Sequence, residues 1–282
     1  MENQFRQYPL EEDILGALDA LGYTQPTEIQ AAVIPSILNG RDIIAKSKTG
    51  SGKTAAFAIP ICNFADWEQN TAQALVLEPT RELAFQVKDE LYAIGRFKRL
   101  KVPVLYGGFP MEKQILTLKQ KTHIVVGTPG RVLDHCKRGT LDLSKVRYVV
   151  IDEADLMLDM GFIHDVKKVI ALLPRRRQTM FFTATLPPEI VKLAKSLLVN
   201  PVEVAVTPVS STVELTEQLV YFTDKASKID LLVSLLQNGA IAGSTLVFTR
   251  TKYGADKLCR KLKAAKIEAL AIHGDKSQGA RQ

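Results

Sequence analysis

The chain has 282 residues, 46% of them hydrophobic and 24% charged, which suits a soluble protein with one large or two modest domains. No segment is apolar enough for a membrane helix and the first four residues are too polar for a signal or transit peptide, so we expect a cytoplasmic protein without a membrane partner. The three cysteines lie too far apart to indicate a zinc site or a disulfide framework, and the net charge of +7 would attract phosphate polymers without proving that the chain binds them.

Short β-branched runs alternate with longer amphipathic segments between about residues 41 and 206. We predict buried parallel strands at residues 42–45, 74–77, 123–126, 148–151 and 179–182. Helical patterns lie between them, for example at residues 81–96 and 187–198. This alternation predicts an α/β fold with a doubly wound parallel sheet, in which ligands bind at the carboxyl ends of the strands.

The pattern breaks at a small, polar segment around Thr207-Pro208-Val209-Ser210-Ser211, which is typical of a linker between domains. A second α/β unit is predicted after it. Its expected strands are residues 218–222, 245–249 and 268–272, and its expected helices are residues 228–237 and 252–265. The predicted organisation is a domain at residues 1–206, a linker at 207–213 and a partial domain at 214–282.

A glycine-containing loop follows the first predicted strand and precedes a predicted helix. The loop reads Ser47-Lys48-Thr49-Gly50-Ser51-Gly52-Lys53-Thr54. Glycine lets backbone N–H groups surround phosphates, the helix amino terminus adds positive potential, and Lys53 can reach the β- and γ-phosphates. Thr54 can hold Mg²⁺, and Ser47 replaces the usual first glycine of this pattern. We therefore predict a phosphate-binding loop that takes ATP with Mg²⁺.

Two carboxylates stand at the end of another predicted strand, in Tyr148-Val149-Val150-Ile151-Asp152-Glu153. Phosphoryl transfer needs the metal ion and the attacking water to be held in place. Asp152 is placed to orient Mg²⁺, and Glu153 is placed to polarise the water as a general base. Together with Lys53, these two residues are the predicted catalytic set.

The segment Asp152-Glu153-Ala154-Asp155 resembles the motif that names the DEAD-box RNA helicase family, and the chain resembles a bacterial member in the order and spacing of its motifs. The resemblance implies a RecA-like domain with the phosphate loop of P-loop NTPases. Gly22-Tyr23-Thr24-Gln25-Pro26-Thr27-Glu28-Ile29-Gln30 resembles the family's Q motif. Carried over, Tyr23 stacks on adenine and Gln30 reads its edge, with Gln25 as a further nucleotide-binding residue.

Three further segments resemble the family's RNA-backbone motifs. They imply contacts to phosphates and 2′-hydroxyls without reading of bases, from Pro79, Thr80, Arg81, Gly107, Gly108, Thr128, Pro129, Gly130 and Arg131. Thr183-Ala184-Thr185 stands where the family usually has Ser-Ala-Thr. By resemblance, its hydroxyls couple the acidic motif, including Asp155, to the domain interface.

The second unit resembles only the first motifs of the family's second RecA-like domain, and Arg250 is its expected RNA contact. The family's later arginine-rich segments have no counterpart here. We therefore expect a truncated second domain, impaired turnover and possible self-association through the unfinished unit.

The expected function is that of an ATP-dependent RNA helicase, with RNA-stimulated ATP hydrolysis and local unwinding of short duplexes. Two alternatives stay open. One is a non-catalytic, ATP-gated RNA-binding module. The other is a phosphate-loop ATPase that acts on DNA or protein, against which the Q-motif resemblance argues.

Overall fold

The structure is a computed structural model and describes residues 3–48, 50–206, 217–241, 243–276 and 280. By its internal contacts the chain divides into two compact units, Met1–Val209 and Ser210–Gln282. The linker predicted at residues 207–213 lies outside the described residues, as does Thr49 of the glycine loop.

The first unit contains a seven-stranded parallel sheet with the strand order β3-β4-β2-β5-β6-β1-β7. The strands are β1 (Ile43–Lys46), β2 (Ala74–Leu77), β3 (Val104–Leu105), β4 (Ile124–Gly127), β5 (Tyr148–Ile151), β6 (Gln178–Thr183) and β7 (Val202–Ala205). The predicted α/β class and parallel sheet are confirmed. The prediction missed β3, which has only two residues, and β7, whose alternating exposure marks it as an edge strand.

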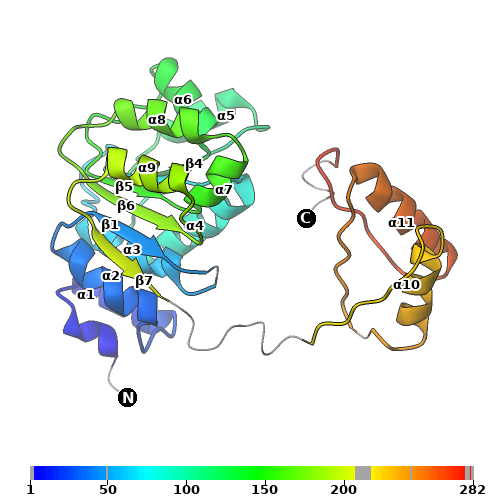
Figure 1. The fold of residues 1–282 in the computed structure, drawn as a ribbon. Helices are drawn as coiled ribbons and strands as arrows, with labels where there is room; N and C mark the ends of the chain where they lie inside the picture. Colours follow the sequence, from blue (N-terminus) through cyan, green and yellow to red (C-terminus); the bar gives the residue numbers. More distant parts are fainter. Residues whose placement is uncertain (1–2, 49, 207–216, 242, 277–279, 281–282) are drawn as a thin grey trace. The chain divides into compact units, whose positions relative to one another are not determined.

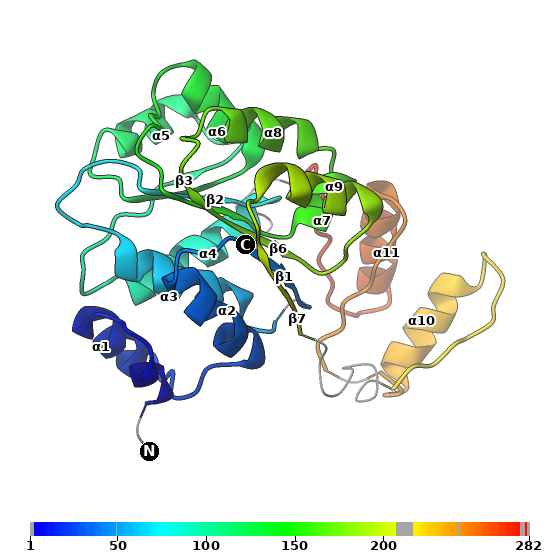
Figure 2. The same cartoon turned by 60° about the vertical axis from the view of Figure 1, so that its left-hand side comes forward.

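Helices cover both faces of this sheet (Figures 1 and 2). One face carries α1 (Glu12–Ala20), α2 (Glu28–Leu38), α3 (Lys53–Phe64) and α4 (Arg81–Ile94), preceded by the short 3₁₀ helix η1 (Gln4–Gln7). The other carries α5 (Met111–Leu118), α6 (Pro129–Lys137), α7 (Ala154–Asp159), α8 (Ile163–Ala171) and α9 (Pro188–Leu197).

Two hydrophobic clusters hold these layers together because side chains of a strand alternate between the sheet's faces. Val76 and Val150 pack in the cluster beneath α1 to α4, whereas Leu77 and Ile151 pack in the cluster beneath α6 to α9. Burial on both faces explains why the central strands read as continuous apolar runs. None of the described helices is long and apolar enough to cross a membrane.

The second unit contains α10 (Lys228–Gln237) and α11 (Lys252–Ala264), which match the two predicted helices closely. The three strands predicted at residues 218–222, 245–249 and 268–272 were wrong, because these described segments are extended without strand pairing. Their apolar side chains remain exposed, with Phe222 97%, Phe248 88% and Leu270 89% accessible. A strand is stable only when neighbours pair with it and cover a face, and neither condition is met in this small unit.

Candidate functional site

The predicted functional segments lie along one edge of the sheet, at the carboxyl ends of the parallel strands. The neighbouring strands β5, β6 and β1 lead into the acidic motif, the Thr183 segment and the glycine loop. The next strands across the sheet, β2, β4 and β3, lead into the three segments expected to contact RNA. We call the first group the nucleotide half and the second the rim half of this edge.

The glycine loop has the backbone geometry that its glycines permit. Gly50 has a φ of 81° and Gly52 a φ of 90°, both in the left-handed region that side chains rarely adopt. At Gly52 a Cβ atom would lie 2.6 Å from Nε2 of Gln30, so a side chain has no room there. Ser51 donates a hydroxyl hydrogen bond of 3.0 Å to Oγ of the buried Ser47, and Lys48 is exposed. Ser47 thus braces the loop at the position of the usual first glycine.

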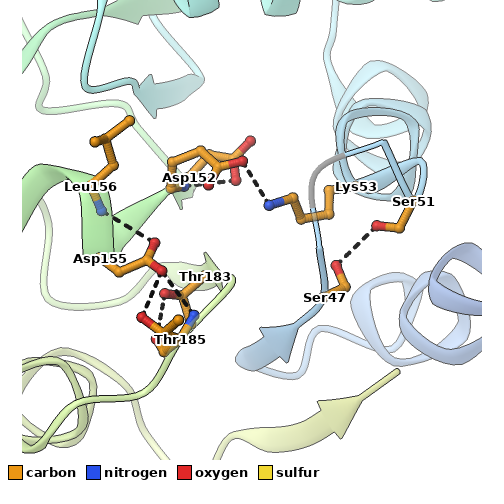
Figure 3. A network of polar contacts seen from close by, with 9 residues as sticks. Ser47, Ser51, Lys53, Asp152, Asp155, Leu156, Thr183 and Thr185 are labelled. Carbon is orange, nitrogen blue, oxygen red and sulfur yellow. Dashed lines mark hydrogen bonds and ion pairs between the residues drawn. The ribbon is translucent and has the colours of Figure 1, made fainter. Parts of the chain in front are cut away.

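Helix α3 begins directly after Gly52 with Lys53 and Thr54, so its free N–H groups and positive dipole end face the loop. The Lys53 ammonium is buried and forms an ion pair of 2.7 Å with Oε1 of Glu153 (Figure 3). Sequence analysis placed both residues at the site but did not foresee this pair. Glu153 therefore pairs with the amine that is expected to bind phosphate.

Asp152 lies beside this pair, 4% exposed, and its Oδ1 accepts a hydrogen bond of 2.8 Å from the Glu153 backbone N–H. Burial raises the pKa of Asp152 to about 6; the Lys53 ammonium acts in the opposite direction, and the Glu153 carboxylate reinforces the rise. Glu153 itself has a φ of 47°, which places it in the left-handed region just before α7. Strained backbone of this kind is frequent where side chains are held for function.

A chain of hydrogen bonds links the acidic motif to the glycine loop, and Figure 3 shows its part at Asp155, Thr183 and Thr185. Oδ2 of Asp155 accepts bonds of 2.8 Å from both the backbone N–H and the hydroxyl of Thr185. The Thr183 hydroxyl donates to the Thr185 carbonyl at 2.7 Å, and the Ser47 N–H donates to the Thr183 carbonyl at 3.1 Å. Burial alone would raise the pKa of Asp155, but the bonds from Thr185 outweigh it and hold this pKa below its ordinary value.

The segment that resembles the Q motif is fastened to the glycine loop by side chains. Nε2 of Gln30 donates to the Gly52 carbonyl at 3.2 Å, and Oε1 of Gln30 accepts from the Thr27 N–H at 3.0 Å. The Thr27 hydroxyl donates to the Ser51 carbonyl at 2.9 Å. Sequence analysis missed the role of Thr27, although Thr-x-x-Gln is the signature of a capping box and could have marked it.

Tyr23 and Gln25, the two other residues of this segment that are expected to bind the nucleotide, make fewer contacts with the glycine loop. The Tyr23 hydroxyl donates a hydrogen bond of 2.6 Å to Oε1 of Glu90, and its ring lies edge-on to Phe5 at 6.2 Å between centroids. Burial, with Glu90 nearby, raises the pKa of Tyr23. Gln25 is exposed on the loop before α2. Tyr23 is therefore oriented by its neighbours, whereas Gln25 lies at the surface.

In the rim half, the structure brings two arginines to the turn at residues 107–109. A Cβ atom on Gly108 would lie 3.9 Å from Nη1 of Arg81, and Nη1 of Arg131 donates to the Phe109 carbonyl at 2.9 Å. Gly107 and Gly108 are exposed. Two guanidinium groups and exposed backbone thus meet on one side of the sheet edge.

Helix amino termini add to this positive rim. Thr80 caps α4 by accepting a hydrogen bond of 3.2 Å from the Leu83 N–H, and Thr128 precedes α6, whose first residue is Pro129. Such helix ends attract anions. Of the other expected contacts, Pro79 is buried, Gly130 is half-buried, and Arg250 is exposed in the separate Ser210–Gln282 unit.

The nucleotide half suits Mg²⁺ bound together with a nucleotide. Within the described part of the chain, no three His, Cys, Asp or Glu side chains form a group that could hold a metal ion alone. Mg²⁺ usually takes only one or two protein ligands, together with phosphates and water. The buried Asp152 carboxylate and the Thr54 hydroxyl on the first turn of α3 are oxygen donors of the kind this ion prefers.

Comparison with known proteins agrees with this geometry. The profile of the DEAD/DEAH box helicase family matches residues 27–193. The chain is 47% identical to the ATP-dependent RNA helicase DbpA of Bacillus subtilis, over 96% of the chain and 57% of that protein. It is 43% identical to the DEAD-box ATP-dependent RNA helicase CshA of Geobacillus kaustophilus, over 98% of the chain and 59% of that protein.

A solved structure of a DEAD box protein from Methanococcus jannaschii superimposes with a TM-score of 0.69 at 41% identity, covering 98% of the chain and 74% of that protein. The chain spans somewhat more than half of the length of these two curated relatives.

Proposed function

The chain belongs to the DEAD/DEAH box helicase family, and from this premise we propose that it binds ATP with Mg²⁺ at the nucleotide half of the sheet edge and RNA at the rim half. The observation that carries the proposal is the buried Lys53–Glu153 pair beside Asp152, at the mouth of a left-handed glycine loop. A buried ion pair at a ligand site can exchange one of its partners for a charged ligand.

ATP would be held through its phosphates by the loop and the first turn of α3. The N–H groups of the loop would surround the phosphates, which the left-handed φ values of Gly50 and Gly52 permit, and Lys53 would leave Glu153 for the phosphate oxygens. Gln30 retains one amide hydrogen and one lone pair beyond the bonds described above, which leaves it able to bind an adenine edge. The Tyr23 ring would supply the apolar platform.

Thr54 and Asp152 would hold Mg²⁺, which when bound screens the phosphates and polarises them for attack. Once Lys53 has moved to the phosphates, the carboxylate of Glu153 is released to accept a proton from a water molecule. The Lys53–Glu153 ion pair therefore keeps the general base Glu153 paired until the nucleotide phosphates take its place on Lys53.

RNA would lie along the rim half. Arg81, Arg131 and the backbone of the turn at residues 107–109 offer contacts to phosphates. Contacts of this kind hold RNA without reading its bases. The hydrogen-bonded chain of Ser47, Thr183, Thr185 and Asp155 would report the nucleotide state to the rest of the protein. Arg250 would add a contact from the second unit.

We further propose that this 282-residue chain turns ATP over slowly and separates duplexes poorly. Phosphoryl transfer is accelerated by positive charge that meets the γ-phosphate in the transition state. Among the described residues, Lys53 is the basic side chain that forms an ion pair with the acidic motif after β5. An assay of ATP hydrolysis with and without RNA tests this: turnover like that of an intact two-domain helicase contradicts slow turnover, whereas failure to bind ATP contradicts the whole assignment.

The second candidate is a non-catalytic, ATP-gated RNA-binding module, which the occupied state of both Lys53 and Glu153 favours. Single-turnover hydrolysis separates the two functions. Slow but measurable hydrolysis that disappears in Glu153→Gln supports the enzyme, and hydrolysis no faster than the protein-free background in both proteins supports the module. Competition between RNA and DNA oligonucleotides with a nonhydrolysable ATP analogue tests the DNA alternative, because equal binding would argue against an RNA protein.

We also propose that the Ser210–Gln282 unit promotes self-association. Its extended segments expose large apolar side chains, including Phe222, Phe248 and Leu270. Exposed apolar chain with unpaired backbone favours pairing with another copy. Sedimentation velocity should show a mass that rises with protein concentration; a monomer at every concentration would contradict this.

A further inference from the structure

Glu78 is a buried carboxylate at the boundary between the two halves of the sheet edge. It directly follows β2, just as Asp152 directly follows β5, and Leu77 pairs with Ile151 in register on these adjacent strands. The pairing continues one step further, because the Asp152 N–H donates to the Leu77 carbonyl at 3.2 Å. Since side chains alternate along a strand, Glu78 and Asp152 lie side by side on the face that carries Val76 and Val150.

Glu78 is fully buried, yet neither of its carboxyl oxygens has a hydrogen-bond partner within the described part of the chain. Buried carboxyl groups are normally hydrogen-bonded, so an unpartnered one needs an explanation. Burial, together with the Asp152 and Glu153 carboxylates, raises the pKa of Glu78, and the Lys53 ammonium acts in the opposite direction. Glu78 is therefore in electrostatic contact with the three charged groups of the nucleotide half.

Acidic groups outnumber basic groups at this place. The carboxyl groups of Glu78, Asp152 and Glu153 lie near one ammonium group, and nucleotide phosphates would bring further negative charge to the same spot. A divalent cation is the ligand that would relieve this excess. The three carboxylates are not arranged to bind an ion directly, but Mg²⁺ retains several of its waters, and these waters donate hydrogen bonds to carboxylates in an outer shell.

We propose that Glu78 is a third carboxylate of the cation site, a positioning residue that accepts hydrogen bonds from the water shell of Mg²⁺ while Asp152 orients the ion. The inference rests on the proposed function, since it places the residue at the same nucleotide site. Waters of the Mg²⁺ shell would supply hydrogen-bond donors to the two unpartnered oxygens of Glu78. Nucleotide binding would then depend more strongly on the divalent cation.

The test is binding of a fluorescent ADP analogue to the full 282-residue chain, first in excess EDTA and then across a Mg²⁺ titration. In Glu78→Gln, we expect the Mg²⁺ concentration at half-maximal effect to rise about tenfold, within the range found for other outer-shell groups of metal sites. In EDTA the same variant should bind ADP at least as tightly as the wild type, because the amide carries no charge that could repel the phosphates.

Glu78→Ala is the second variant, because it removes the charge without adding a donor, and it should shift the Mg²⁺ midpoint in the same direction. Asp89→Asn is the matched control, an exposed carboxylate on α4 whose change should shift neither quantity. Unchanged Mg²⁺ midpoints in both Glu78 variants would overturn the proposal. So would equal weakening with EDTA and with Mg²⁺, or loss of folding in both variants, because each indicates a structural role.

The wild-type titration tests the proposed function separately. If the wild type binds the ADP analogue without any Mg²⁺ dependence, or does not bind it, the proposed function fails. If the wild type depends on Mg²⁺ and the Glu78 variants depend on it equally, only the role of Glu78 fails.

Discussion

The two halves of the sheet edge use polar side chains in opposite ways. In the nucleotide half, Lys53, Asp152 and Thr183 are buried and bonded to other parts of the chain. In the rim half, Gly107 and Gly108 are exposed, and Arg81 and Arg131 are partly exposed. The charged side chains of the first half are enclosed, whereas the turn of the second half is open to solvent.

This difference matches two kinds of ligand. Charges inside a protein interact strongly because water does not screen them, so a small ligand that displaces an internal partner there is bound tightly and selectively. A long polyanion instead needs an accessible surface on which many weak phosphate contacts add up. Variants that change the binding of one ligand and not the other would separate the two halves.

The largest effect is expected for Lys53→Met in the nucleotide half. The change removes a charge-assisted bond to phosphate and leaves Glu153 unpaired, so the dissociation constant for ADP with Mg²⁺ should rise about 10- to 100-fold. RNA affinity without nucleotide should stay the same. Fluorescence titrations measure both, with Lys192→Met on the exposed face of α9 as the control. A parallel loss of RNA affinity would mean that the halves are not separate.

In the rim half, we expect Arg81→Ala together with Arg131→Ala to weaken RNA binding about tenfold, with ADP affinity unchanged. Each arginine that contacts a phosphate contributes to the salt dependence, so the slope of log affinity against log salt should fall by about 1 per residue. Fluorescence anisotropy of a labelled oligonucleotide at several salt concentrations measures this slope. The matched lysine variants retain the charge, and they should recover most of the salt dependence if the contact is electrostatic.

The link between the halves is tested by Asp155→Asn. The carboxylate accepts two hydrogen bonds from Thr185, and an amide replaces one accepting oxygen by a donor. We expect the factor by which RNA tightens nucleotide binding to fall by about fivefold, while each ligand alone binds nearly as before. Nucleotide titrations with and without saturating RNA measure the factor. An unchanged factor would remove this chain of bonds from the proposed coupling.

The smallest functional effect is expected for Thr183→Ser, because the hydroxyl that bonds to the Thr185 carbonyl is retained. Loss of one methyl group from a fully buried position should lower the free energy of unfolding by about 1 kcal/mol. Denaturant titration measures the stability change, and Thr183→Val is the contrast that removes the hydroxyl. If the factor by which RNA tightens nucleotide binding fell in Thr183→Ser, the methyl group and not the hydroxyl would be responsible for the coupling.

The sequence predicts the parts of the site that depend on local pattern. The glycine loop and the pair Asp152 and Glu153 each directly follow a strand with a clear apolar run, so their position at the carboxyl edge could be foreseen. The ion pair of Lys53 with Glu153 could not, because it depends on the order of strands in the sheet and on two side-chain conformations.

Other misses have different physical causes. Glu78 carries no local signal, since its burial arises only when β2 and β5 lie side by side. The predicted strands of the second unit have suitable sequences, but a strand also needs partners to pair with, and pattern alone does not report them.

The division of the edge into two halves is tested most directly by hydrogen–deuterium exchange of the 282-residue chain, measured with ADP and Mg²⁺ and, separately, with an RNA oligonucleotide. We expect the nucleotide to protect the glycine loop, the start of α3 and residues 152–155, and RNA alone to protect residues 80–83, 106–109 and 128–131. Protection of the rim segments by nucleotide, with the glycine loop unaffected, would contradict the account.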